Sequence, residues 1–175
     1  MLNGTNLKLV ASWLPAYYSL SSWRLAFSLR RDGANLSTLL AKCSARKSGG
    51  GIPNASNSTS FIILVEDSWG YVFGGFISHS LVNCNEYYGS GENFVFSVMP
   101  VAEKYKWAGE NDLFVVSSPS NFAMGGAGEG FAFQLDDELA TGVSNRSQTY
   151  NNEVLSSNEF FKCLNVEVWE LSSAK

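Results

Sequence analysis

The side chains that could carry out chemistry in this sequence are one histidine, three cysteines and several groups of carboxylates. A serine or cysteine hydrolase needs a base, almost always a histidine, within hydrogen-bonding reach of its nucleophile. His79 is the one histidine of the chain; it follows a predicted strand, and the sequence contains no Gly-x-Ser-x-Gly elbow. We therefore interpret His79 as a solvated residue at the end of a strand, and we predict no catalytic residue from it.

The cysteines, Cys43, Cys84 and Cys163, are odd in number and widely spaced, and no two of them form a Cys-x-x-Cys pair. This pattern indicates neither a complete disulfide framework nor a zinc site, and it favours a reducing compartment. A protective or catalytic thiol needs a nearby cation that lowers its pKa. Cys43 lies in a basic stretch, residues 42–47, and is therefore the candidate redox thiol of the chain.

Carboxylates cluster at residues 66–67, at 110 and 112, and at 136–138, so a glycosidase pair or a Ca²⁺ site has to be considered. The ligand spacing of an EF-hand is absent, and acidic residues between strands usually form turns and caps. Residues 125–130 (GGAGEG) invite a phosphate-loop interpretation, but no Gly-Lys-Ser/Thr follows and the next predicted element is a strand. We therefore predict no metal and no cofactor. An enzyme that uses a reactive cysteine or a carboxylate pair, with redox or hydrolytic activity, remains the alternative.

The composition fits one folded domain of 175 residues, because 45% of the residues are apolar and only 16% are charged. A net charge of −4 excludes a basic footprint for nucleic acid. The first residues lack the pattern of a signal peptide, and no apolar stretch reaches the length of a membrane span. Five Asn-x-Ser/Thr sequons are attributed to an Asn- and Ser-rich composition, and the five tryptophans to core and boundary positions rather than a carbohydrate platform. We expect a cytoplasmic protein without membrane insertion.

The first forty residues are predicted to be helical. From Ser21 onward, Trp23, Ala26 and Phe27 follow the spacing of one helix face, and Asp32-Gly33 supplies a stop. A second helix over 38–42 is expected to be capped by Ser37. Residues 44–60 are rich in Gly, Ser, Asn and Pro and are predicted to be a flexible loop.

From residue 61 the period changes to that of strands, predicted at 61–65, 71–77, 94–99, 105–107, 113–116, 121–124, 131–135 and 166–171. Short strands at this spacing, with little helix between them, predict two packed antiparallel sheets. The expected fold is mainly β with flanking helices: one domain over 1–175, with a helical opening at 1–43, the loop at 44–60 and a β-sandwich at 61–171.

Six segments resemble successive blocks of the TLDc (TBC/LysM-associated) domain: residues 64–76 (LVEDSWGYVFGGF), 88–96, 105–114 (YKWAGENDLF), 123–131, 149–156 and 165–171. Residues 14–15, 23–25 and 33–40 are similar to the helical opening of that family. The sequence departs from the family pattern in its longer 44–60 loop, in Ala127 and Glu129 within a glycine run, and in Thr141 to Ser144, where many members have a histidine.

The resemblance implies a β-sandwich flanked by short helices, protection against oxidative damage and binding to the vacuolar proton-pumping ATPase (V-ATPase), without an established catalytic activity. The protein would then be cytoplasmic, or peripheral to endolysosomal membranes through its partner. Loops on a sheet scaffold usually carry recognition, with glycines shaping the backbone and carboxylates contacting a basic partner. The candidate partner-binding residues are Glu92, Gly109, Glu110, Asn111, Asp112, Gly125, Gly126, Gly128 and Glu129. The alternative is that Glu110 and Asn111 only cap a turn.

Overall fold

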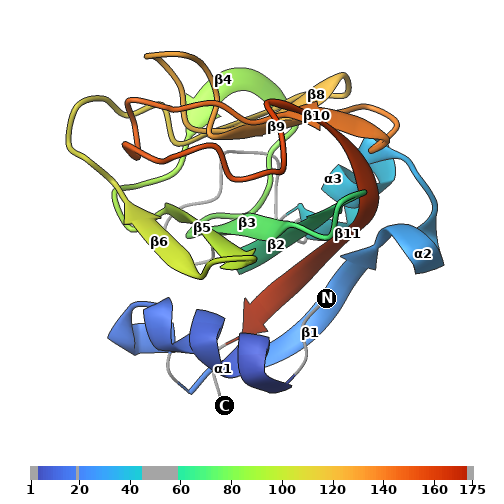
Figure 1. The fold of residues 1–175 in the computed structure, drawn as a ribbon. Helices are drawn as coiled ribbons and strands as arrows, with labels where there is room; N and C mark the ends of the chain where they lie inside the picture. The colour runs from blue at the N-terminus through green and yellow to red at the C-terminus, as the bar shows by residue number, and fades with distance from the viewer. Residues whose placement is uncertain (1–3, 19, 45–58, 173–175) are drawn as a thin grey trace.

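A long C-terminal strand, β11 (Phe160–Ser172), organises the fold because it belongs to both layers of a folded antiparallel sheet. The computed structural model describes residues 4–18, 20–44 and 59–172. In the layer drawn uppermost in Figure 1, β11 is followed by β10 (Thr141–Val143), β9 (Phe133–Asp136), β8 (Asn121–Met124), β7 (Val115–Ser117) and β4 (Cys84–Tyr88). In the other layer it pairs with β1 (Ser22–Ser28) and β2 (Ser60–Asp67), followed by β3 (Val72–Ile77), β5 (Phe94–Met99) and β6 (Glu103–Lys106).

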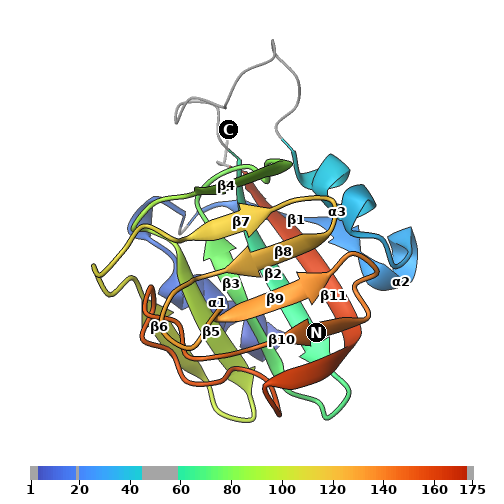
Figure 2. The ribbon, with the colours of Figure 1, turned by 90° about the horizontal axis from the view of Figure 1, so that it is seen from above.

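The two layers become one sheet because β11 changes layer partway along its length. Residues 160–162 pair with β10, whereas the part from Cys163 onward pairs with β2, and a bulge lies between Cys163 and Asn165. A bulge bends a strand, which allows one strand to leave one layer and enter the other. The structure therefore confirms the predicted β-rich fold with flanking helices and adds that the two layers share a strand (Figure 2).

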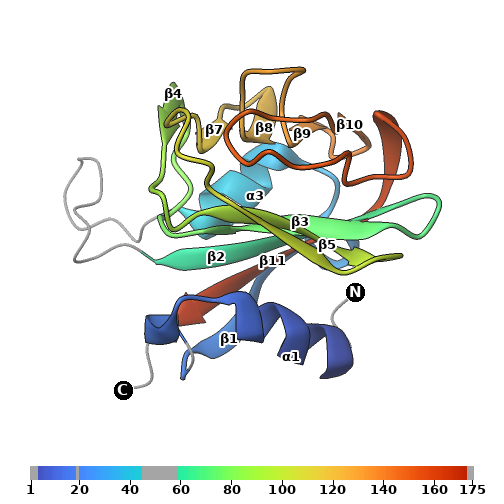
Figure 3. The same cartoon turned by 60° about the vertical axis from the view of Figure 1, so that its left-hand side comes forward.

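The apolar run of β2 is continuous because both of its faces are covered. Phe73 of the neighbouring β3 faces the other layer, where its ring meets the rings of Phe133 and Phe161 edge to face. Ile62 and Leu64 face the opposite way, into a second cluster that also contains Val10 of α1 (Gly4–Trp13). Figure 3 shows α1 under the sheet and α3 (Leu36–Cys43) beside the upper layer. None of the described helices has the length and apolar character that spanning a bilayer requires.

The prediction of a helix from Ser21 is wrong, because residues 22–28 form β1. Trp23 and Leu25 alternate with the exposed Ser22 and Arg24, which is the period of a strand. Trp23, Leu25 and Phe27 pair with Leu171, Trp169 and Val168 of β11. A bulge between Leu25 and Phe27 buries Ala26 together with Phe27, and this adjacency imitated a helical stripe. Only short helices flank β1: η1 (Ala16–Tyr18) and α2 (Leu29–Asp32), which ends at Gly33 with φ of +87° as predicted.

The N-cap of α3 also differs from the prediction. Asn35, not Ser37, caps this helix, and its side chain accepts a hydrogen bond from the Thr38 N–H (2.9 Å). The strands β4 and β10 were not predicted, because β4 is largely exposed and β10 has only three residues. The predicted flexible loop lies, for residues 45–58, outside the described residues.

Candidate functional site

The structure brings two of the predicted loops together through a residue that the prediction did not include. Thr149 is buried in the segment between β10 and β11. Its hydroxyl accepts a hydrogen bond from the Gly126 N–H (2.9 Å) and donates one to Asn111 Oδ1 (2.8 Å). The carbonyl of Thr149 accepts a third bond from the Ala108 N–H (2.9 Å). The loops at 107–113 and 125–130 are therefore joined in one cluster, beside β6 in Figure 2.

Asn111 has a structural role in this cluster. Its backbone carbonyl oxygen accepts a hydrogen bond from the Trp107 indole N–H (2.8 Å), and its side-chain oxygen, Oδ1, accepts one from the Leu113 N–H (3.1 Å). These bonds fix the turn that carries Glu110 and Asp112, two exposed residues. The amide of Asn111 thus shapes the loop, while the neighbouring carboxylates remain available to a partner.

The glycines of the second loop are required by space and by backbone conformation. A Cβ at Gly126 would lie 2.9 Å from Leu113 Cδ1 and 3.0 Å from the Tyr87 hydroxyl, so this position packs directly against its neighbours. Gly125 has φ of +76°, in the left-handed region that favours glycine, and Ala127 adopts φ of +58°. Ala127 therefore adopts a left-handed conformation that suits glycine better than alanine.

Glu129 is exposed at the tip of the same loop and lies near Arg146, whose pKa is raised chiefly by its hydrogen bonds to Glu153 and to a smaller extent by the charge of Glu129. Arg146 contacts the Glu153 carboxylate with two nitrogens, at 2.8 and 2.6 Å. The backbone N–H of Glu129 donates to the Arg146 carbonyl (3.1 Å), and Gly128 forms an isolated bridge with Ser147. The loop cluster therefore carries three exposed carboxylates, those of Glu110, Asp112 and Glu129, and Arg146, which is paired with Glu153, lies beside it.

Glu92 lies in a different surface feature from the loop carboxylates. It borders a concavity of about 470 Å³ that also has Trp13, Lys104 and Trp107 in its wall. The Lys104 ammonium donates to the Trp13 carbonyl and lies 4.1 Å from the centroid of the Phe94 ring. Trp107 connects this concavity to the loop cluster through its bond to the Asn111 carbonyl.

The structure contradicts the interpretation of Cys43 as a reactive thiol. Its side chain is wholly buried in the core, and burial raises the pKa of the thiol to about 12. The neighbouring Lys42 ammonium pairs with Asp32 (3.1 Å). Burial likewise raises the pKa of Cys163 to about 12. The charge of the sequence neighbour Lys42 lowers the pKa of Cys43, but desolvation of the thiolate in the core raises it by more.

Thiol labelling tests this conclusion directly. A pKa of about 12 leaves on the order of 10⁻⁵ of the Cys43 thiol ionised at pH 7. In a short pulse of iodoacetamide, we expect Cys84 to be modified in the native protein and Cys43 only after urea is added, as read by mass spectrometry of the peptides. Equal labelling of Cys43 and Cys84 in the native protein would contradict the burial of Cys43.

Two carboxylates that could have formed catalytic pairs serve turn structure instead. Asp67 is fully buried and accepts hydrogen bonds from the backbone N–H groups of Trp69, Tyr71 and Ser157, at 2.9, 3.0 and 2.9 Å. Asp136 accepts bonds from the Ala140 N–H and from both the N–H and the hydroxyl of Thr141. These carboxylates act as turn formers, as the sequence indicated.

His79 is half-buried, and burial lowers its pKa. Its Nδ1 lies 2.8 Å from the hydroxyl of the preceding residue, Ser78. That hydroxyl is itself buried, donates to Asn93 Oδ1 (2.7 Å) and lies 2.9 Å from the Ser90 hydroxyl. The serine next to the histidine therefore links the end of β3 to the turn before β5.

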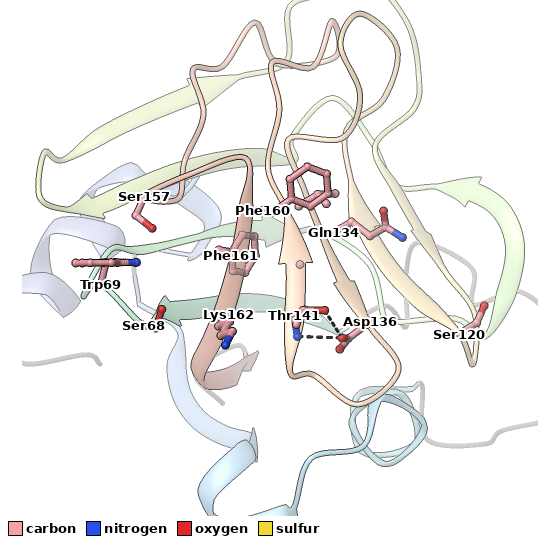
Figure 4. A pocket seen from close by; sticks show the side chains of 12 residues that line it. Ser68, Trp69, Ser120, Gln134, Asp136, Thr141, Ser157, Phe160, Phe161 and Lys162 are labelled. Carbon is pink, nitrogen blue, oxygen red and sulfur yellow. Dashed lines mark hydrogen bonds between the residues drawn. The ribbon is translucent and has the colours of Figure 1, made fainter.

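A groove that the sequence did not indicate runs over the outer surface where β9, β10 and the start of β11 lie side by side (Figure 4). Its volume is about 970 Å³. Figure 4 shows Trp69 at one end, on the turn between β2 and β3, and Ser120 at the other, with Thr141 and Lys162 between them. The strand pairing places side chains of the lining in two rows across the three strands: Gln134, Val143 and Phe160 in one, and Asp136, Thr141 and Lys162 in the other. The sequence did not predict these rows because it does not give the register of the strands.

Comparison with known proteins identifies a family and relatives that match nearly the whole chain. Residues 1–172 match the family model described as the TLDc domain. Nuclear receptor coactivator 7 of Homo sapiens is 32% identical over 169 residues, which cover 97% of this chain and 17% of that protein. Oxidation resistance protein 1 of Homo sapiens is 33% identical over 147 residues, which cover 84% of this chain and 16% of that protein. The chain thus spans about one sixth of the length of these curated relatives.

Proposed function

We propose that this chain, which belongs to the TLDc domain family, is a non-enzymatic protein-interaction module that contributes to resistance against oxidative damage. Its similarity to Oxidation resistance protein 1 supports the oxidation-resistance role. The partner that the family resemblance implies is the V-ATPase. The observation that carries the proposal is the loop cluster, in which buried Thr149 joins two loops and leaves the carboxylates of Glu110, Asp112 and Glu129 exposed.

The loop cluster has the properties of a preorganised recognition surface. The hydroxyl of Thr149 and the side chain of Asn111 fix the backbone, so little conformational freedom is lost when a partner binds. Exposed carboxylates on such a rigid frame attract a basic partner and fix its orientation. In contrast, burial of Cys43 and use of Asp67 and Asp136 in turns give no support to a thiol or carboxylate enzyme.

A pull-down with purified V-ATPase tests the proposal. The wild-type chain is expected to be captured. The variant Glu110→Lys, Asp112→Lys should lose at least about tenfold in captured protein, because loss of a central hot-spot contact costs about 2 kcal/mol or more and tenfold corresponds to about 1.4 kcal/mol. Its melting temperature should change little, since both side chains are exposed.

The matched control reverses two other exposed carboxylates, Glu86→Lys in β4 and Glu103→Lys in β6, which lie outside both candidate loops and outside the lining of the groove. This variant has the same change of net charge and should be captured as efficiently as the wild type. Equal loss in both variants would show a dependence on overall charge and would overturn the assignment of the loops. Failure of the wild-type chain to be captured would overturn the assignment of the partner.

A further inference from the structure

The groove on the outer face of β9, β10 and β11 exposes two large aromatic side chains toward one space. Trp69 is 78% exposed and Phe160 is 79% exposed, and both line the groove (Figure 4). Val143 lies directly opposite Phe160 in the β10–β11 pair and adds apolar surface to the floor. Aromatic residues held in a concave site are typical anchors for a bound side chain, because their burial on binding releases water from a large apolar area.

The position of Trp69 is fixed by the buried carboxylate of Asp67. One oxygen of Asp67 accepts hydrogen bonds from the backbone N–H groups of Trp69 and Tyr71, and the other accepts one from Ser157 (2.9 Å). Gly70 completes the turn with φ of +83°. The indole is therefore presented on a tight turn whose backbone is already ordered. Ordering a mobile loop is one of the main costs of association, and this wall of the groove avoids it.

The charges around the groove are predominantly negative. Asp137 and Glu138 are exposed in the turn that connects β9 to β10, and Glu159 is exposed immediately before Phe160. No ion pair found among residues 4–18, 20–44 and 59–172 involves these three carboxylates. Lys162 is the cation in the lining, and the carboxylate of Asp136 is held by Ala140 and Thr141. Together with Asp136, these carboxylates outnumber the two cations, Lys162 in the lining and Arg146, which interacts with Glu159, and this balance favours a positively charged occupant.

We propose that this groove binds an extended basic segment of a protein partner, with an apolar or aromatic side chain seated between Trp69 and Phe160. Arginine or lysine residues on either side of that anchor face Asp137, Glu138 and Glu159. A guanidinium group can also stack on the exposed indole of Trp69, which is the ring type that binds cations best. The carboxylates disfavour anionic lipid and nucleic acid, whose phosphates they would repel.

This surface is distinct from the loop cluster of the proposed function. None of the candidate loop residues at 109–112 and 125–129 is in the lining of the groove. The two surfaces can therefore be inactivated separately, and failure of one proposal does not decide the other. A partner that contacted both would combine two modest affinities into a tighter one.

The test uses short fluorescein-labelled peptides with a central Phe, Leu or Trp flanked by arginines, and matched peptides with glutamates in place of the arginines. Fluorescence anisotropy with the whole chain is expected to show binding of the arginine peptides only, weakened by salt. Trp69→Ala and Phe160→Ala should each weaken binding at least about tenfold. Asp137→Lys with Glu138→Lys should also weaken it, whereas Lys162→Glu should strengthen it.

Two control variants define the specificity. Tyr17→Ala removes another exposed aromatic, 76% exposed and outside the groove, and Glu110→Lys with Asp112→Lys changes the loop cluster. Both should leave peptide binding unchanged. The proposal would be overturned if the glutamate peptides bound more tightly than the arginine peptides, or if Lys162→Glu bound the arginine peptides more weakly than the wild type. It would also be overturned if Trp69→Ala and Phe160→Ala bound them as tightly as the wild type. Absence of binding for every peptide, or binding to phosphatidylserine vesicles in their place, would overturn it as well.

Discussion

Replacing Gly74 by alanine is expected to destabilise the chain by about 3 kcal/mol, the upper end of the usual cost of overpacking, because one added methyl group would collide with the neighbouring strand. A Cβ at Gly74 would lie 1.9 Å from the carbonyl oxygen of Ile63 and 3.1 Å from the Cα of Leu64. Both atoms belong to the backbone of β2, and Leu64 is the residue that pairs with Gly74. The strand would have to move away along the centre of the sheet, where β2 joins β3 to β11.

Gly75, the next residue of β3, provides the matched control. A Cβ there would approach the side chain of Met124, at 2.4 Å from Sδ and 2.7 Å from Cε. A methionine side chain has several rotatable bonds and can move, so Gly75→Ala should destabilise less than Gly74→Ala. Shortening the obstacle with Met124→Ala should also reduce the effect of Gly75→Ala, and it should leave the effect of Gly74→Ala unchanged.

Urea unfolding of these variants and double variants measures the four free energies of unfolding that each cycle needs. Similar destabilisation by Gly74→Ala and Gly75→Ala would mean that β2 can shift as easily as a side chain. In that event the close approach of β2 to Gly74 would not require a glycine at this position.

The strands that the sequence predicted are those whose pattern is local. Phe61 to Val65 form an uninterrupted apolar run because the sandwich covers one face of β2 and α1 covers the other. Burial of either face requires apolar side chains, so the run can be recognised in the sequence alone. In contrast, β1 became a strand through its pairing with β11, a segment at the opposite end of the chain. The helical spacing of Trp23, Ala26 and Phe27 carried no information about that partner.

The candidate site shows the same division. The loop at 109–112 was predicted because its glycine, amide and carboxylates are adjacent in sequence. The hydroxyl that joins it to Gly126 was not, because Thr149 lies 23 residues from Gly126 and 38 from Asn111. Cys43 was misinterpreted for a related reason: the basic residues beside it in sequence gave no sign that its thiol lies in the core, where burial raises the pKa. The hydrogen bonds of Thr149 and the burial of Cys43 determine what these side chains can do, and both depend on contacts between residues far apart in the sequence.

Thr149→Val is expected to loosen the loop cluster while leaving the sheet intact. Valine matches threonine in shape, so the substitution mainly removes the hydroxyl. The buried Gly126 N–H then loses its acceptor and Asn111 Oδ1 loses one of its two described donors. A buried polar group left without a partner costs about 1–3 kcal/mol, so we expect about 2–3 kcal/mol less stability and faster amide exchange at Gly126.

Thr149→Ser is the control, because it keeps the hydroxyl and removes only a methyl group. It should preserve exchange protection at Gly126 and most of the stability. The pair also separates shape from charge in partner binding. Thr149→Val retains the carboxylates of Glu110 and Asp112 but loosens the loop that holds them, so capture of the partner should fall in Thr149→Val and persist in Thr149→Ser. Unchanged protection of Gly126 in Thr149→Val would show that the hydroxyl does not hold the two loops together.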